Sequence, residues 1–188
     1  MSIEQAMLKY LPNALTISRL LLALPLGVLI LRQEFGWALA VGFLAGVTDA
    51  LDGFSARRLG YLSQLGAALD PIADKTLILV AFLCLASSAL IEWWLAALVI
   101  GRDLVIVLGA LGYRVLIGPF KFGATALSKI NMATQIAFCV LLLAAQLIPV
   151  PSAFISAATG IVVLIAVISG LDYILNWSRK AWQTRGMN

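Results

Sequence analysis

The stretch DALDGFSARRLGYLSQLGAALDPIAD, Asp49–Asp74, lies between two strongly apolar runs and carries four of the nine acidic residues of the chain. These four are Asp49, Asp52, Asp70 and Asp74. A carboxylate at membrane depth costs about 2.5–3.5 kcal/mol on insertion scales, and four of them close together would also repel one another. Such a cluster persists only if something neutralises it.

The spacing of the four aspartates indicates what neutralises them. Asp49 and Asp52 are three residues apart, and Asp70 and Asp74 are four apart, so in helices each pair shares one face. The chain has no His, and no Cys stands beside the acids. The donor set is therefore all oxygen, which suits Mg²⁺, Mn²⁺ or Ca²⁺. Two divalent cations would balance the four carboxylates.

Between the two acidic pairs, Gly and Arg residues add the features of a diphosphate site. Gly53 and Gly66 allow a backbone or a ligand to approach closely. Arg57 places a guanidinium, which is always charged, beside the acids. Metal ions and an Arg beside a glycine-lined gap are the means by which proteins bind a diphosphate.

The composition of the whole chain excludes a soluble globular fold. Of its 188 residues 62% are hydrophobic and 12% are charged, with a formal net charge of +4, whereas soluble domains are about 25% charged. The absence of His excludes an imidazole base and a zinc site of the usual His type. These features predict an integral membrane protein.

Six apolar stretches predict an all-α fold of six transmembrane helices. They are Ala14–Leu31, Trp37–Asp52, Leu69–Leu90, Trp93–Ile117, Ile130–Ile148 and Ala153–Asn176. Gly53–Gly66 is expected to form a polar connection between the second and third helices. We expect a single membrane domain over residues 1–188, with a short interfacial helix at 1–12, the six-helix bundle at 13–176 and a cytoplasmic tail at 177–188.

The distribution of cations predicts the orientation of these spans. Most Lys and Arg residues fall at one set of helix ends: Lys9, Arg57, Arg58, Arg114, Lys121, Lys129, Arg179, Lys180 and Arg185. Cytoplasmic loops carry an excess of such residues. Both termini and the Asp49–Asp74 stretch are therefore expected on the cytoplasmic side, with Trp93 and Trp94 at the opposite interface.

Simpler explanations exist for the acids taken singly. Asp49 could cap a helix or pair with Arg57, and Asp70 directly precedes Pro71, an order common at helix starts. Intramembrane acids also mark the ion paths of cation transporters. That alternative is weakened because the acids cluster near one side of the membrane and no inverted repeat is visible. None of the single explanations covers all four acids.

The motif resembles, without departure, the signature of the CDP-alcohol phosphatidyltransferases. Its fixed positions read Asp49-x2-Asp52-Gly53-x2-Ala56-Arg57-x8-Gly66-x3-Asp70-x3-Asp74. Upstream, Pro12-Asn13-x2-Thr16-x2-Arg19 resembles the start of the family's first helix. The resemblance covers the whole chain and implies a homodimeric six-helix membrane enzyme. Such enzymes move a phosphatidyl group from a CDP-linked donor to an alcohol and release CMP.

The resemblance also implies a role for each motif residue. The four aspartates would bind two divalent cations, Mg²⁺ or Mn²⁺, and Asp74 would act as the general base that deprotonates the acceptor hydroxyl. The implied contacts to the nucleotide and diphosphate are Asp52, Gly53, Ala56, Arg57 and Gly66, with Asn13 and Thr16 beside the cytidine.

The acceptor is predicted from the later helices. Phosphatidylglycerophosphate synthases, which use glycerol 3-phosphate, typically show an Arg-Glu pair, a second Arg two turns on, and Lys-x-Lys-Thr before a Gln. Here the pair reads Arg102-Asp103, the second Arg is absent, and the later segment reads Lys129-Ile130-Asn131-Met132, followed by Gln135. This pattern resembles instead the CMP-forming cardiolipin synthases, whose acceptor is phosphatidylglycerol.

The residues expected to contact the acceptor phosphate are basic: Arg102, Arg114, Lys121 and Lys129. Two alternatives stay open. The last three residues also obey the positive-inside rule, and Arg102-Asp103 is equally read as a buried ion pair that fixes the bundle.

The resemblance implies a role in phospholipid biosynthesis in a bacterial cytoplasmic (inner) membrane. The implied partners are CDP-diacylglycerol, phosphatidylglycerol or glycerol 3-phosphate, membrane lipids and a second copy of the chain, with no nucleic acid.

Overall fold

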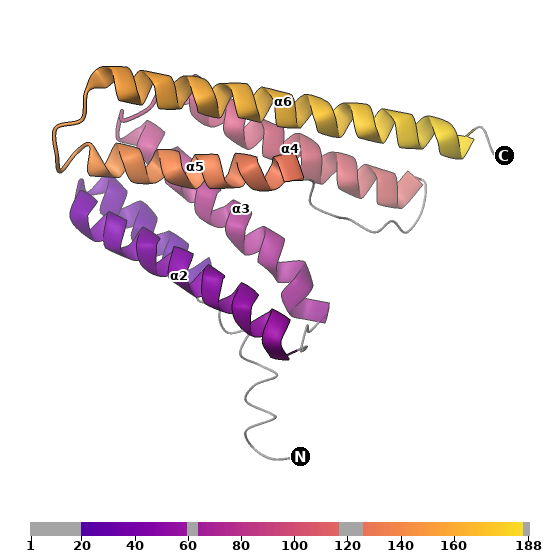
Figure 1. Ribbon diagram of the computed structural model, residues 1–188, viewed down its shortest axis with the longest axis horizontal. Coiled ribbons are helices and arrows are strands. Elements are labelled where there is room, and N and C mark those ends of the chain that lie inside the picture. Colours follow the sequence, from indigo (N-terminus) through magenta and orange to yellow (C-terminus); the bar gives the residue numbers. More distant parts are fainter. Residues whose placement is uncertain (1–19, 60–63, 117–125, 186–188) are drawn as a thin grey trace, which may run out of the picture. The chain divides into compact units, whose positions relative to one another are not determined.

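The computed structural model of the protein describes residues 20–59, 64–116 and 126–185 (Figure 1). Within these ranges the described side chains are those of residues 20–48, 75–109 and 127–173. The described chain is all-helical, as predicted, and forms six helices. They are an apolar helix at Leu20–Leu31, α2 at Phe35–Leu59, α3 at Gln64–Ser87, α4 at Trp93–Leu116, α5 at Ala126–Ala144 and α6 at Ser152–Arg185.

The helix boundaries differ from the sequence prediction where polar residues continue a helix. The expected connection Gly53–Gly66 is wrong, because α2 continues to Leu59 and α3 begins at Gln64. Similarly, α6 continues to Arg185, beyond the predicted end at Asn176. Apolar runs mark the part of a helix that lies in the membrane, whereas the helix itself continues for as long as its backbone hydrogen bonds do. The predicted start at Ala14 and the interfacial segment 1–12 lie outside the described residues.

Two helix ends are closed by the same backbone motif without a glycine. Gln33 and Ala89 adopt left-handed φ angles of 61° and 56°. At each end, one N–H bonds three residues back, from Gln33 to Ile30 and from Ala89 to Ala86, and the next N–H bonds five residues back. This is the Schellman arrangement, which usually takes Gly at the left-handed position. The absence of a glycine explains why the sequence placed the end of α3 at Leu90 rather than Ser87.

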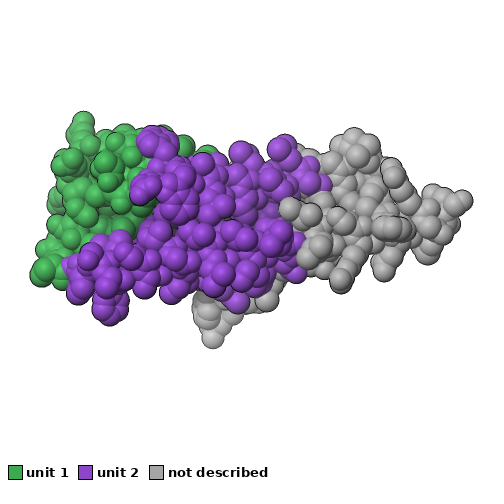
Figure 2. All heavy atoms as spheres, turned by 90° about the horizontal axis from the view of Figure 1, so that it is seen from above, with its two compact units in different colours: residues 1–91, 139–149 green, residues 92–138, 150–188 purple. Residues whose placement is uncertain are grey.

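Backbone contacts group the chain into two compact units (Figure 2). Unit 1 comprises residues 1–91 and 139–149. In it the Leu20–Leu31 helix packs against α3, because a Cβ added at Gly27 would lie 2.8 Å from Cγ1 of Val80 and 3.1 Å from Sγ of Cys84. At the end of the same helix, the Ser88 hydroxyl donates to the carbonyl of Ile30 at 3.3 Å. The α3 helix, which carries Asp70 and Asp74, is thus held by close packing along its second half.

Unit 2 comprises residues 92–138 and 150–188. Its helices α4 and α6 lie side by side (Figure 1). The buried stripe of α4 includes Leu95, Val99 and Ile106, and that of α6 includes Val162 and Ala166. These spacings of three or four residues per step are those of one helix face.

The outward faces of the helices are also apolar. The Ser152–Tyr173 part of α6 has a mean hydropathy of 2.4, yet only 17% of it is buried inside the protein. A core helix of a soluble protein would bury most of such a stretch, so the exposed apolar side chains need a lipid environment. Leu127–Ala144 of α5 is likewise long and apolar enough to cross a membrane. Exposed Trp93 and Trp94 fit an interfacial position, where Trp94 donates to Glu92 at 2.6 Å.

Filling the contact at Gly27 is expected to destabilise the fold. Gly27→Val should lower the free energy of unfolding by about 1–3 kcal/mol, because the added methyl groups would overlap Val80 and Cys84. Thermal unfolding in detergent measures this as a lower Tm. Gly160→Ala in α6 is the matched control, since a Cβ there meets nothing within 4 Å. A Tm for Gly27→Val equal to that of the control would contradict the close packing.

Candidate functional site

The four motif aspartates lie on two continuous helices. Asp49 and Asp52 are in α2, and Asp70 and Asp74 are in α3, while their side chains lie outside the described residues. Because each helix is unbroken across its pair, the spacings of three and four residues place each pair on one helix face. The interpretation of Asp70 as a helix cap is wrong, since α3 begins six residues earlier at Gln64.

The continuity of α2 and α3 also places the small motif residues on the helix faces that carry the acids. At about 100° per residue, the α2 positions of the motif fall within an arc of about 140°, and those of α3 within about 80°. The α2 positions are Asp49, Asp52, Gly53, Ala56 and Arg57, and the α3 positions are Gly66, Asp70 and Asp74. One face of each helix thus combines carboxylates with residues that leave room beside the backbone.

The donor set on these faces fits divalent metal ions. It consists of four carboxylates without His or Cys, the oxygen-only set that Mg²⁺ and Mn²⁺ prefer. Pro71 lies inside α3, directly after Asp70, and has no N–H to donate to the carbonyl of Ala67. The helix therefore carries an interrupted hydrogen-bond ladder next to the acids.

Several expected site residues fall where the structure describes little. Asn13, Thr16 and Lys121 lie outside the described residues. Arg114 belongs to α4, but its side chain is not described. Lys129 is described on α5 and is exposed, so the structure does not bring it into the buried part of unit 2.

Arg102 lies at the centre of a buried polar cluster in unit 2. It is 8% exposed and stands on the buried stripe of α4. Its Nη1 pairs with Oδ1 of Asp103 at 2.5 Å, and its Nη2 donates to the hydroxyls of Ser169 on α6 and, at 3.5 Å, Ser128 on α5. One guanidinium therefore joins three helices. The interpretation of Arg102-Asp103 as a buried ion pair agrees with these contacts.

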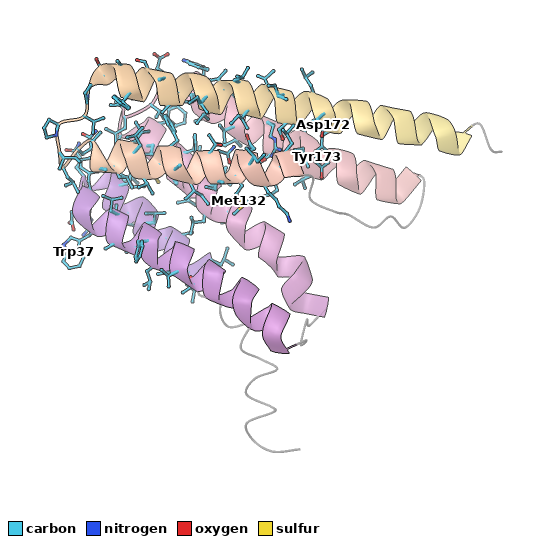
Figure 3. All side chains as sticks on the ribbon, viewed as in Figure 1. Trp37, Met132, Asp172 and Tyr173 are labelled. Carbon is cyan, nitrogen blue, oxygen red and sulfur yellow. The ribbon has the colours of Figure 1, made fainter. Side chains whose placement is uncertain are left out.

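Two residues of α6 next to Arg102 were not predicted from the sequence. Ser169 is fully buried, and Gly170 follows it, where an added Cβ would lie 3.5 Å from Cγ of Arg102. Further on, Asp172 and Tyr173 stand on the same helix (Figure 3), and Tyr173 interacts electrostatically with Arg102 and Asp172. The sequence feature that could have indicated these residues is a polar side chain within an otherwise apolar span.

Two amides on α5 continue the polar face that begins at Ser128. Asn131 is 1% exposed and Gln135 is 2% exposed. They follow Ser128 by three and seven residues, so the three side chains share one face of the helix. Met132, which follows Asn131, is only half-buried (Figure 3). In the described part of the cluster, the single guanidinium of Arg102 is paired with the carboxylate of Asp103, so this pair carries no excess positive charge.

Known proteins are similar to this chain in sequence. Over 142 residues the chain is 39% identical to a cardiolipin synthase (CMP-forming) of Rattus norvegicus, covering 67% of this chain and 47% of the relative. It is 41% identical over 110 residues to a cardiolipin synthase (CMP-forming) of Streptomyces coelicolor, covering 54% of this chain and 51% of the relative. It is 32% identical over 190 residues to the CDP-diacylglycerol–glycerol-3-phosphate 3-phosphatidyltransferase of Bacillus subtilis. This match covers 89% of this chain and 95% of the relative. The chain spans about half the length of these two cardiolipin synthases.

The fold and the motif define a class of protein: a helical membrane protein with paired carboxylates on two consecutive helices. Within this class, the chain belongs to the CDP-alcohol phosphatidyltransferase family, whose sequence signature matches residues 9–171. The members of this family are enzymes that use divalent metals. Membership confirms the resemblance found in the sequence and favours a transferase over a cation transporter.

The Arg102 cluster predicts a measurable coupling between its two charged residues. Arg102→Met is expected to destabilise the protein by about 3–5 kcal/mol, because it removes the guanidinium from a largely buried ion pair with Asp103. Arg102→Met combined with Asp103→Leu should recover most of that loss. Thermal unfolding of both single variants and the double variant measures the coupling. Exposed Lys129→Met is the control, and strictly additive effects would contradict the pairing.

Proposed function

We propose that the protein transfers the phosphatidyl group of CDP-diacylglycerol to the hydroxyl of phosphatidylglycerol, giving cardiolipin and CMP in phospholipid biosynthesis. The family supports the donor and the type of reaction. The cardiolipin synthases among the relatives support the acceptor, because the product of those enzymes is cardiolipin.

One structural observation carries the choice of acceptor. Asn131, which stands where glycerol 3-phosphate enzymes typically have a Lys, is a buried neutral amide, and the buried Arg102 is already balanced by Asp103. A phosphomonoester dianion in a buried site needs cations beside it. A lipid phosphodiester carries a single negative charge, so it needs fewer cations in the site.

A second candidate is a phosphatidylglycerophosphate synthase that uses glycerol 3-phosphate. It is favoured by the similarity to the Bacillus subtilis enzyme, which extends over 95% of that relative. The two candidates share the donor, the metal-binding aspartates and the release of CMP, and they differ only in the alcohol.

The proposed reaction is a direct displacement at phosphorus. The acceptor oxygen forms a bond to the phosphorus that carries the diacylglycerol, the bond from that phosphorus to the bridging oxygen breaks, and CMP leaves with the electron pair. Asp74 accepts the proton of the acceptor hydroxyl. Asp49, Asp52, Asp70 and Asp74 would hold two divalent cations, Mg²⁺ or Mn²⁺, whose charge offsets that of the diphosphate.

The remaining motif residues bind the donor in this proposal. Arg57 pairs with the diphosphate through its guanidinium. Gly53, Ala56 and Gly66 leave space beside the backbone of α2 and α3 for the nucleotide. Asn13 and Thr16 lie beside the cytidine, while Arg114, Lys121 and Lys129 supply positive charge to the acceptor phosphate.

The same proposal includes the membrane location, the orientation and the oligomeric state of the enzyme. The six helices are proposed to span a bacterial cytoplasmic membrane, with both termini and the motif on the cytoplasmic side, where the cations gather. The working unit is proposed to be a homodimer.

An assay of CMP release decides between the two acceptors. The purified protein is expected to release CMP from CDP-diacylglycerol in the presence of Mg²⁺ or Mn²⁺ and phosphatidylglycerol, and mass spectrometry should detect cardiolipin. Parallel reactions contain glycerol 3-phosphate or no acceptor. Release only with glycerol 3-phosphate would establish the second candidate instead. Release without any acceptor would indicate hydrolysis.

Replacing the proposed base separates binding from turnover. Asp74→Asn is expected to keep the thermal protection by CDP with Mg²⁺ but to lower kcat by about 10²–10⁴-fold, because no group accepts the proton. Glu92→Gln is the matched control, since the exposed carboxylate of Glu92 accepts a hydrogen bond from the nearby side chain of Trp94. Turnover of Asp74→Asn near that of the unmodified protein would remove Asp74 as the base.

A further inference from the structure

The described part of the chain buries four polar side chains, and all of them belong to unit 2. They are Arg102, Asn131, Gln135 and Ser169. Each lies on the same helix face as the buried apolar residues of its helix, at a position where an apolar side chain would ordinarily be found. Ser169 bonds to Arg102. The other three side chains each keep one atom without a hydrogen-bond partner.

These three atoms are Nε of Arg102, Oδ1 of Asn131 and Nε2 of Gln135. A buried polar atom without a partner costs about 1–3 kcal/mol, so three of them in one cluster are a substantial loss of stability. Apolar side chains at the two amide positions would avoid most of that loss. In a ligand-binding site the bound ligand offsets such a loss of stability, because it supplies the missing hydrogen-bond partners.

The chemistry of the three atoms indicates the class of ligand. The contact between Arg102 and Ser128 places Ser128 beside the guanidinium, and Asn131 and Gln135 continue the Ser128 face of α5. An amide offers both a donor and an acceptor, and Arg102 Nε offers a further donor. Because Asp103 already offsets the charge of Arg102, the row suits neutral oxygen groups that both donate and accept. Hydroxyl groups of a polyol have this property.

We infer that Asn131 and Gln135 form a hydroxyl-binding subsite for the glycerol headgroup of the acceptor, on the face of α5 whose Ser128 contacts Arg102. The amide oxygen of Asn131 accepts a hydrogen bond from a headgroup hydroxyl, and the amide N–H of Gln135 donates to a headgroup oxygen. This inference rests on the proposed function. In the topology expected from the sequence, the start of α5 and the motif ends of α2 and α3 share the cytoplasmic side of the membrane.

Binding of two lipids that differ only in headgroup hydroxyls tests the subsite. The probes are phosphatidylglycerol and phosphatidylethanol, which has the same phosphodiester without a hydroxyl. Thermal unfolding of the full chain in mixed micelles is expected to show a larger rise in Tm with phosphatidylglycerol. In Asn131→Leu and Gln135→Met this preference should disappear. Protection by CDP with Mg²⁺ should persist in both variants, and their Tm without ligand should be unchanged or higher.

The matched control is Thr134→Val on the same helix. The Thr134 hydroxyl donates within the helix, to the carbonyl of Ile130 at 2.8 Å, so this variant should keep the preference for phosphatidylglycerol. With phosphatidylglycerol as acceptor, Asn131→Leu and Gln135→Met should each raise the acceptor KM about ten-fold, with the donor KM unchanged.

Three results would overturn the subsite. The first is equal protection of the unmodified protein by both lipids. The second is a preference that persists in both amide variants. The third is a lower Tm of both variants together with equal changes in donor and acceptor KM, which would indicate a structural role. Failure of the proposed function is seen separately, as absence of CMP release with phosphatidylglycerol, because the comparison of the two lipids needs no turnover.

Discussion

A guanidinium buried among apolar helices has to be compensated where it lies, and this constraint organises unit 2. Arg102 cannot lose its charge, and the lipid-facing surfaces of its helices offer no water. The compensation comes from the carboxylate of the next residue and from hydroxyls on two further helices. Because each of these groups belongs to a different segment, α4, α5 and α6 can satisfy the charge only in one mutual arrangement. A buried ion pair adds little net stability, but it penalises every other packing of the same helices.

The motif on α2 and α3 follows a different physical logic. Its acids are local pairs on two helices, and an all-oxygen set of carboxylates is the donor set that divalent cations prefer. The continuity of both helices through the motif brings the small residues and the acids to one face of each helix. The diphosphate site is thereby expected on rigid helical backbone. A flexible connection, as expected from Gly53–Gly66, would hold the donor less firmly for in-line displacement.

The motif helices of unit 1 and the polar row of unit 2 differ in chemistry. Four carboxylates on α2 and α3 are the charged groups to which we assign the diphosphate and its metal ions in the proposed function. The polar row of unit 2 is neutral on balance and consists of amides, hydroxyls and one paired guanidinium. Such a row discriminates by hydrogen bonding, in which a missing partner is penalised, rather than by charge. This difference is the physical basis of the proposal that the motif helices bind the donor and the polar row binds the acceptor alcohol.

The sequence by itself determined the helical class, the six apolar segments and the family, because run length, residue spacing and a fixed motif are local properties. It also singled out Arg102-Asp103 and Asn131. It misplaced the ends of α2, α3, α5 and α6, since apolarity marks the part of a helix that lies in the membrane and the Schellman end of α3 at Ala89 carries no glycine. Only the tertiary structure brought Ser169 to Arg102 across 67 residues of chain and left the amides of Asn131 and Gln135 with unpartnered atoms. Which side chain meets a buried charge depends on how helices pack against one another, and no local pattern in the sequence contains that information.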